Sequence, residues 1–402
     1  PELAEKVAAL PYDVMNSEEA REMVKGNPWS FLHVDKAEVD LDPSVGLYED
    51  RVYEKAADNL NKLIADGVLK QDTQPNYYIY RQIMRGKAQS GIVGCASVDD
   101  YLEERIRKHE LTRAEKEADR IRHVDTCNAN TGPIFLTCRD HGRLEAVLQQ
   151  WQETHQPDSD FTAEDGIRHT VWVVDDESVI AAWDKLLASV GDYYIADGHH
   201  RAASAVRVAQ KRRQAHPAYT GSEEFNQFLA VLFPCEELHI WDYNRAVHDL
   251  NGLSPEAFLE QVREKFSIQP EAAAVRPEQM HEFGMYLADS WYRLTAKPGT
   301  YEAADPVARL DVSILQENLL GPVLGIEDPR TSRRIDFVGG IRGLSELERL
   351  VDGGMAVAFS LYPTSISDLM EIADSHRTMP PKSTWFEPKL RSGLFIHTLG
   401  ER

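Results

Sequence analysis

The stretch Tyr193-Tyr194-Ile195-Ala196-Asp197-Gly198-His199-His200-Arg201 decides the fold around it. A short apolar run breaks at Asp-Gly, and small apolar residues then recur at helical spacing as far as Ala209. The pattern predicts a strand that runs to Ala196 and feeds a helix. His199, His200 and Arg201 should lie in the first turn of that helix.

This helix start is a candidate phosphate site. Unpaired N–H groups and the positive end of the helix dipole meet there, and Arg201 adds a guanidinium fork beside two imidazoles. Cationic or donor-rich side chains are unfavourable at this end of a helix unless an anion binds. Asp197 can alternatively be a simple helix cap, but capping does not explain His199-His200-Arg201. We therefore expect Gly198, His199, His200 and Arg201 to bind phosphate.

The remaining pattern predicts an α+β (mixed α/β) fold. Residues 76–83 and 89–98 form a predicted hairpin, and further strands are expected at 169–174, 192–196 and 227–233 with helices between some of them. Helical and short connections together favour a mixed sheet with flanking helices. The pattern of residues changes beyond Asn251, where a helix is predicted to begin at Ser254-Pro255-Glu256. We expect a phosphate- or nucleotide-binding domain over 1–250 and a second α/β domain over 251–402 that closes the cleft.

Composition restricts the partners more than the chemistry. The 402 residues carry 44 basic and 66 acidic side chains, a net charge of -22, which disfavours nucleic acid and anionic membranes as partners. No apolar run approaches the roughly 20 residues of a membrane span, and no signal peptide is evident, so a cytoplasmic protein with a small-molecule ligand is expected. The four cysteines show no paired spacing that indicates zinc or disulfides.

Two further segments are candidates for the same site. Residues 99–122 are densely charged and predict a helix whose face is either solvated or, through Glu110, turned toward a bound phosphate. Residues 379–393 concentrate basic and hydroxyl groups between prolines, so Lys382 and Ser383 are candidates for a phosphate clamp, and a tie between domains is the equal alternative.

Several motifs together resemble one known family. They are Pro11-Tyr12-Asp13-Val14, Tyr78-Ile79-Tyr80-Arg81-Gln82, Gly91-Ile92-Val93-Gly94, Lys108-His109-Glu110, Asp197 to Arg201 and Pro380-Pro381-Lys382-Ser383-Thr384-Trp385-Phe386. They resemble the bacterial and archaeal family called domain of unknown function 1015, over nearly the whole chain. The resemblance makes Tyr12, Asp13 and Arg81 candidate substrate-binding residues, with hydrogen-bonded structural roles as the alternative. Family members usually carry an extra stretch before Pro11, so an N-terminal strand is expected to be absent.

The motif Asp197-Gly198-His199-His200-Arg201 is also similar to the phosphate-binding motif of free serine kinases in the ParB and sulfiredoxin superfamily. That similarity implies a ParB/sulfiredoxin-like sheet. His199 stands where sulfiredoxins have a catalytic cysteine, which argues against sulfinic acid repair, and the acidic charge argues against the DNA reading of ParB. Kinase chemistry remains, with free L-serine as the first candidate acceptor and O-phosphoserine as product.

A phosphotransferase needs charge neutralisation and positioning. We expect Arg201 and the helix N–H groups to hold the phosphates of ATP, ADP or pyrophosphate, and His199 and His200 to donate to the moving group. Asp197 is the candidate to bind Mg²⁺ or orient a histidine, and Glu110 is the candidate base for the acceptor hydroxyl.

Two other functions fit the same residues. A non-catalytic sensor of a nucleotide or phosphometabolite would use the pocket without needing Glu110. A metal-dependent hydrolase with Asp197, His199 and His200 as ligands is the weaker alternative, because adjacent histidines at a helix start diverge and seldom share a metal.

Overall fold

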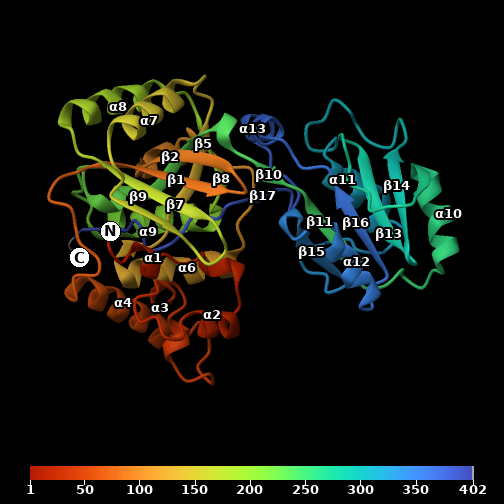
Figure 1. The fold of residues 1–402 in the computed structure, drawn as a ribbon, viewed down its shortest axis with the longest axis horizontal. Coiled ribbons are helices and arrows are strands. Elements are labelled where there is room, and N and C mark those ends of the chain that lie inside the picture. Colours follow the sequence, from red (N-terminus) through yellow and green to blue (C-terminus); the bar gives the residue numbers. More distant parts are fainter. Residues whose placement is uncertain (401–402) are drawn as a thin grey trace. The chain divides into compact units, whose positions relative to one another are not determined.

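The computed structural model describes residues 1–400, which form two compact units (Figure 1). Unit 1 comprises Pro1–Leu238 together with the closing segment from Pro388 onward, and unit 2 comprises His239–Glu387. The sequence placed a single boundary near residue 250, whereas the chain leaves unit 1 after Leu238 and returns at Pro388. The reason is strand pairing: residues 243–247 pair inside unit 2, and residues 397–398 pair inside unit 1.

Unit 1 is built on a mixed sheet of eight strands in the order β3-β8-β5-β9-β2-β1-β7-β6. The strands of this unit are β1 (Tyr77–Met84), β2 (Lys87–Ser97), β3 (Ile106–Arg107), β5 (Ile134–Cys138), β6 (Ser159–Thr162), β7 (Arg168–Val174), β8 (Tyr193–Asp197) and β9 (Gln227–Pro234), with a separate pair of β4 (Ala129–Asn130) and β18 (His397–Thr398). The β3–β8 and β5–β9 pairs are parallel and the other pairs of the large sheet are antiparallel. The predicted mixed α/β fold is confirmed.

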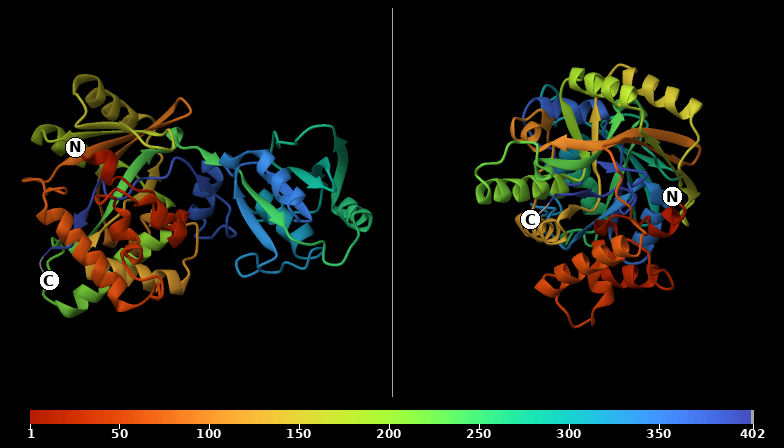
Figure 2. Two further views of the ribbon diagram at one scale, coloured as in Figure 1. Left: turned by 60° about the horizontal axis from the view of Figure 1, so that its bottom comes forward. Right: turned by 90° about the vertical axis from the view of Figure 1, so that its left-hand side faces the viewer.

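Helices cover this sheet on both sides. They are α1 (Ala4–Val7), α2 (Ser17–Met23), α3 (Leu32–Asp35), α4 (Asp50–Ala65), α5 (Val98–Leu102), α6 (Ala114–Cys127), α7 (Arg143–Thr154), α8 (Glu177–Ser189) and α9 (His199–Ala215). Helices α7 and α8 lie on one side of the sheet, and α2, α3, α4 and α6 lie on the other (Figures 1 and 2). The buried face of α9 is rich in small residues, including Ala202, Ala205 and Ala209, which let the helix pack closely on the core.

The charged region that was predicted as one helix is interrupted. Residues 99–122 fall into α5, the short strand β3 and the first part of α6, with a loop from Lys108 to Arg113 between strand and helix. The single-helix prediction was wrong because Ile106 is buried and pairs in register with Tyr193 of β8. This pairing carries the loop that holds Glu110 to the end of β8.

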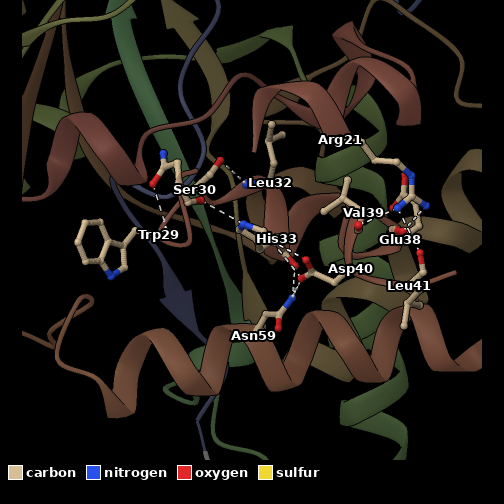
Figure 3. A network of polar contacts seen from close by, with 11 residues as sticks. Arg21, Trp29, Ser30, Leu32, His33, Glu38, Val39, Asp40, Leu41 and Asn59 are labelled. Carbon is tan, nitrogen blue, oxygen red and sulfur yellow. Dashed lines mark hydrogen bonds and ion pairs between the residues drawn. The ribbon is translucent and has the colours of Figure 1, made fainter. Parts of the chain in front are cut away.

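A polar network ties the N-terminal helices together (Figure 3). His33 approaches the Asp40 carboxylate through Nδ1 at 2.9 Å and the Asn27 carbonyl through Nε2 at 3.2 Å, so both ring nitrogens face acceptors. The hydrogen bond to Asp40 raises the pKa of His33. Asn59 of α4 donates to the His33 carbonyl at 2.6 Å and to Asp40 at 2.7 Å, which joins α3 to α4.

Unit 2 is an antiparallel sheet of six strands in the order β12-β14-β13-β16-β11-β15, with a two-stranded pair beside it. Its strands are β10 (Ile240–Trp241), β11 (Tyr243–Val247), β12 (Phe266–Glu271), β13 (Glu282–Leu287), β14 (Ser290–Ala296), β15 (Ile335–Gly339), β16 (Val357–Leu361) and β17 (Trp385–Phe386), and its helices are α10 (Pro255–Lys265), α11 (Asp311–Leu315), α12 (Leu344–Asp352) and α13 (Ile366–Asp374). Leu347 of α12 is fully buried against Ala358 and Tyr286 of the sheet, so this unit has a core of its own. Across residues 1–400, no helix has the length and apolar character that crossing a membrane requires.

Candidate functional site

The predicted turn between a strand and a helix is present where β8 meets α9. β8 ends at Asp197, Gly198 adopts a left-handed conformation with φ of 92°, and α9 begins at His199. Asp197 Oδ1 accepts the N–H of Gly198 at 2.8 Å, and no side chain caps the helix from its N-cap position. The capping alternative for Asp197 is therefore wrong, and the N-terminus of α9 has no built-in anion at that position.

Asp197 is held by the closing segment of the chain. Lys389 Nζ donates to Asp197 Oδ2 at 3.0 Å. Burial alone would raise the pKa of Asp197, but the charges of Lys389 and Arg201 lower it below its usual range. Both carboxylate oxygens thus accept hydrogen bonds, a geometry that favours an ion pair over the predicted Mg²⁺ ligand.

Arg201 lies across the turn and lines a pocket. Its Nη1 donates to the Pro133 carbonyl at 2.6 Å, and a Cβ on Gly198 would come within 3.3 Å of its Nε. The pocket is formed by polar and apolar residues from α6, from the segment that leads into β5 and from the N-terminal region. Its lining residues are Tyr12, Asp35, Arg120, His123, Val124, Asn130, Thr131, Gly132, Ile134 and Arg201.

Arg120 gives this pocket a second guanidinium. It is 9% exposed, pairs with Asp119 at 2.8 Å and lies 4.0 Å from the centroid of the Tyr12 ring. Burial raises the pKa of Tyr12 well above its usual value, so the phenol stays neutral as a potential donor. The structure therefore brings Tyr12 to the Arg201 pocket, and Asp13 stands exposed beside it, near enough for its charge to favour protonation of His200.

Glu110 reaches the motif from the loop between β3 and α6. Its Oε2 lies 3.7 Å from His199 Nδ1, beyond hydrogen-bond distance, and its side chain is 42% exposed. The neighbouring His109 is buried, with its ring perpendicular to that of His199 and the two centroids 4.4 Å apart. Glu110, proposed from sequence as a base, thus lies beside the predicted phosphate site.

Burial disfavours the protonated form of both histidines of the motif. Burial lowers the pKa of His199 to about 4, against the opposing field of Asp197, and burial also lowers the pKa of His200. The Arg113 N–H donates to His200 Nε2 at 3.0 Å, which assigns the ring proton to Nδ1. These rings supply hydrogen-bond donors, not the positive charge that the sequence also suggested.

Three predicted residues are placed elsewhere. Arg81 lies on β1, separated from β8 by β2, β9 and β5, and its guanidinium stacks 4.7 Å from Trp172 and donates to Gln152 at 3.3 Å. The structure does not bring it to the motif. Lys382 and Ser383 belong to unit 2, where Ser383 Oγ donates to the Pro380 carbonyl at 2.6 Å and Lys382 Nζ lies 5.6 Å from the Tyr243 ring centroid. Their part in a phosphate clamp stays a prediction.

Sequence reasoning missed three residues of the site. His109 stood in the quoted motif Lys108-His109-Glu110 without an assigned role, and Arg120 was one of many charges in a region predicted to be either solvated or turned, through Glu110, toward a bound phosphate. Lys389 was set among the basic residues of 379–393, but only the fold pairs it with Asp197, 192 positions earlier.

Comparison with known proteins shows which family the chain belongs to. The model of a family described as protein of unknown function, DUF1015, matches residues 1–313. The chain belongs to this family. The resemblance found in the motifs is therefore confirmed, although the family's description assigns no reaction. No curated protein matches the sequence.

Solved structures with partial similarity include a mutant of free serine kinase in complex with ADP, at 12% identity and a TM-score of 0.38 over 75% of this chain and 88% of that one. A conserved hypothetical protein from Pyrococcus furiosus matches at 13% identity with a TM-score of 0.36, over 75% of this chain and 93% of that one. SbnI with a C-terminal truncation, from Staphylococcus aureus, matches at 13% identity with a TM-score of 0.37, over 76% of this chain and 87% of that one. Scores this low support no conclusion about the ligand or reaction of this chain.

Proposed function

We propose that this protein is a small-molecule kinase that transfers a phosphoryl group from ATP, ADP or pyrophosphate to the hydroxyl of a metabolite. The observation that carries the proposal is the place of Glu110, whose carboxylate lies 3.7 Å from His199 at the uncapped start of α9. A carboxylate beside an anion site is unfavourable for binding alone, and it is what a reaction that deprotonates a hydroxyl requires.

The donor phosphates would bind between the N-terminus of α9 and the two guanidiniums of the pocket. Main-chain N–H groups of the first turn and the dipole of a 17-residue helix favour an anion at this end. The guanidinium of Arg201 donates to the neutral Pro133 carbonyl, whereas that of Arg120 is paired with the Asp119 carboxylate. Arg201 is therefore the main electrostatic contact, and Arg120 adds hydrogen-bond donors.

The neutral imidazoles suit the transferred group. His199 and His200 can each donate one N–H without competing with Arg201 for the charge of the phosphates. Asp197 has a supporting role in this scheme: it fixes the Gly198 N–H and the Lys389 ammonium, which keeps the turn in its left-handed conformation. Mg²⁺, when bound, would neutralise the phosphate charge. Because both Asp197 oxygens are engaged, Mg²⁺ would be held chiefly by the phosphates and water.

Free L-serine is the acceptor we propose to test first. Its support is the likeness of Asp197-Gly198-His199-His200-Arg201 to the motif of free serine kinases. Tyr12 and Asp13 lie near the pocket and offer a phenol and a carboxylate, groups that can bind the carboxylate and ammonium of an amino acid.

The test is mass-spectrometric detection of O-phosphoserine after incubation with L-serine, Mg²⁺ and ATP, ADP or pyrophosphate in parallel. We expect product with one donor. Arg201→Ala should lower the yield by at least 100-fold, and Glu110→Gln should lower turnover by 100-fold or more while leaving nucleotide affinity within threefold. Arg207→Gln is the matched control, because this arginine is on the same helix, 62% exposed and paired with Glu117.

The outcomes separate the two leading functions. Product that survives Glu110→Gln would remove the base from the mechanism. An absence of product with every donor, combined with a nucleotide-dependent thermal shift that Arg201→Ala abolishes, would contradict serine kinase activity and support the non-catalytic sensor.

A further inference from the structure

Two side chains that the kinase proposal uses, Glu110 and His199, form a cluster with His109, to which that proposal gives no role. His109, Glu110 and His199 each place one ligand atom within 4.8 Å of the others. Two come from the loop after β3 and one from the first turn of α9. We propose that these three residues bind one divalent transition-metal ion, with Zn²⁺ as the first candidate.

His109 is the residue that requires an explanation. Its side chain is 1% exposed, and neither Nδ1 nor Nε2 makes a hydrogen bond. The Ile195 carbonyl is close enough to favour protonation of the ring, but it does not reach bonding geometry. A buried polar group without a hydrogen-bond partner destabilises a fold, so a fold that keeps one at a cluster of ligand atoms indicates a partner that binds there.

The geometry suits a metal of this class. Metal–ligand distances of about 2.1 Å place neighbouring ligand atoms of a tetrahedral site about 3.4 Å apart. The distance between His199 Nδ1 and Glu110 Oε2 is 3.7 Å, so small torsional changes would close the site. Glu110 is 42% exposed and provides the route by which an ion enters.

The ligand types favour zinc or a similar ion over magnesium. Imidazole nitrogen suits zinc, copper, iron and nickel, whereas Mg²⁺ prefers oxygen ligands. His199 must offer Nδ1, and its Nε2 then carries the proton. The cost of this tautomer change is the hydrogen bond that the His109 main-chain N–H donates to Nε2, which at 3.5 Å is at the limit of hydrogen-bond distance.

The neighbouring groups do not complete the site in another way. His200 Nε2 already accepts the Arg113 N–H, and Asp197 is paired with Lys389. The metal ligands therefore differ from the Asp197, His199 and His200 set considered from sequence. A bound metal would occupy Glu110, so the ion and the acceptor deprotonation proposed above exclude each other.

The experiment is titration of the full chain, stripped with chelator, with Zn²⁺ against a chromogenic competitor, without nucleotide or serine. We expect one high-affinity ion per chain. Glu110→Gln and His109→Gln should each weaken binding at least 30-fold, and His216→Gln, which changes an exposed histidine outside the cluster, should leave it within twofold. Titration with Co²⁺ should give visible absorption bands that both cluster variants lose.

Glu110→Gln keeps the test decisive if His109→Gln fails to fold, since Glu110 is partly exposed. Stoichiometric binding that neither variant weakens, or no binding tighter than the competitor allows, would overturn the site. Because metal affinity is measured without substrates, failure here is distinguishable from failure of the kinase: a protein that makes O-phosphoserine and binds no Zn²⁺ retains the first proposal and loses the second.

Discussion

Burial keeps several histidines of unit 1 neutral in the folded protein. The pKa of His199 is lowered to about 4 and that of His169 to about 3, in both cases mainly because the ring is buried. His169 also lies against the guanidinium of Arg391, which disfavours its protonation. An imidazole in the unfolded chain titrates near pH 6.5, so protonation of these rings couples to unfolding.

We therefore predict that acid destabilises the protein well above the range where carboxylates titrate. Between pH 6.5 and 5 the unfolded state binds protons that His199 and His169 cannot bind when folded, so the free energy of unfolding falls as pH falls. Each ring should contribute about 2 kcal/mol of loss by pH 5. Urea denaturation at pH 7 and 5 measures it. Replacing His169 by Gln should reduce the difference, and a variant of exposed His216 should not; equal pH dependence in all three proteins would contradict the assignment.

The ion pair of Asp197 and Lys389 gives a second prediction at this scale. Lys389→Met removes the ammonium and leaves the partly buried carboxylate without its main counter-charge, so its pKa should rise. We expect a loss of about 1–2 kcal/mol, less than for a fully buried pair because both side chains retain some exposure. A double-mutant cycle with Asp197→Asn measures the coupling by urea denaturation. Additive effects of the two changes would show that the pair contributes nothing.

The residues of the site differ in how far sequence could predict them. Gly198, His199, His200 and Arg201 are contiguous, so one local pattern predicts both their conformation and their chemistry. His109 lies 90 positions from its contact His199, and Lys389 lies 192 positions from its contact Asp197. No local periodicity contains that information, because it depends on the register of β3 against β8 and on the return of the chain to unit 1.

At the scale of elements, the turn between β8 and α9 depends on a single glycine. Gly198 has a φ of 92°, a region that disfavours a side chain, and an added Cβ would lie 3.3 Å from Arg201 Nε. The backbone conformation of this turn therefore affects the position of the Arg201 guanidinium.

We predict that Gly198→Ala lowers stability by about 1–2 kcal/mol through backbone strain and also weakens pyrophosphate binding by displacing Arg201. Gly191→Ala is the matched control, because Gly191 lies just before β8 and an added Cβ there meets no atom within 4 Å. Thermal melts and calorimetric titration with pyrophosphate give the two readouts. Unchanged affinity in the Gly198 variant would separate the turn from the anion site.

Elements with strong local signals were predicted well, and elements made by long-range pairing were not. The hairpin of β1 and β2 turns at Arg85-Gly86 as its sequence indicates, and β8 and α9 have their predicted places. The charged residues before α6 were predicted to form one helix because their charges repeat at helical spacing. Burial of Ile106 in the sheet overrides that pattern, and this override creates the loop that carries His109 and Glu110.

At the scale of the whole molecule, the chain order differs from the predicted division into two consecutive domains. The pattern of residues changes after Asn251, but β11 begins before that point and pairs with β15 and β16 about 90 to 115 positions later. A local sequence pattern does not predict pairing between strands that lie so far apart in the chain. Unit 2 is therefore a continuous insertion between two parts of unit 1.

The ends of the insertion explain how unit 1 can tolerate it, and they give the last prediction. β10 and β17 pair antiparallel, with Trp241 opposite Trp385, so the chain enters and leaves unit 2 through adjacent strands. Because unit 2 also has its own antiparallel sheet and its own core, residues 239–387 expressed alone should fold. A cooperative thermal melt with native-like circular dichroism measures this.

The complementary truncation should behave in the opposite way. A chain that stops after Glu387 retains all of unit 2 but loses the closing segment, and with it the Lys389 pair, the contact of Arg391 with His169 and Asp165, and the strand that pairs with β4. Buried partners would be left unpaired, so unit 1 should lose several kcal/mol of stability or fail to fold while the melt of unit 2 persists. If the truncated chain instead keeps both transitions, the closing segment does not stabilise unit 1, and the basis for placing Lys389 in the site is removed with it.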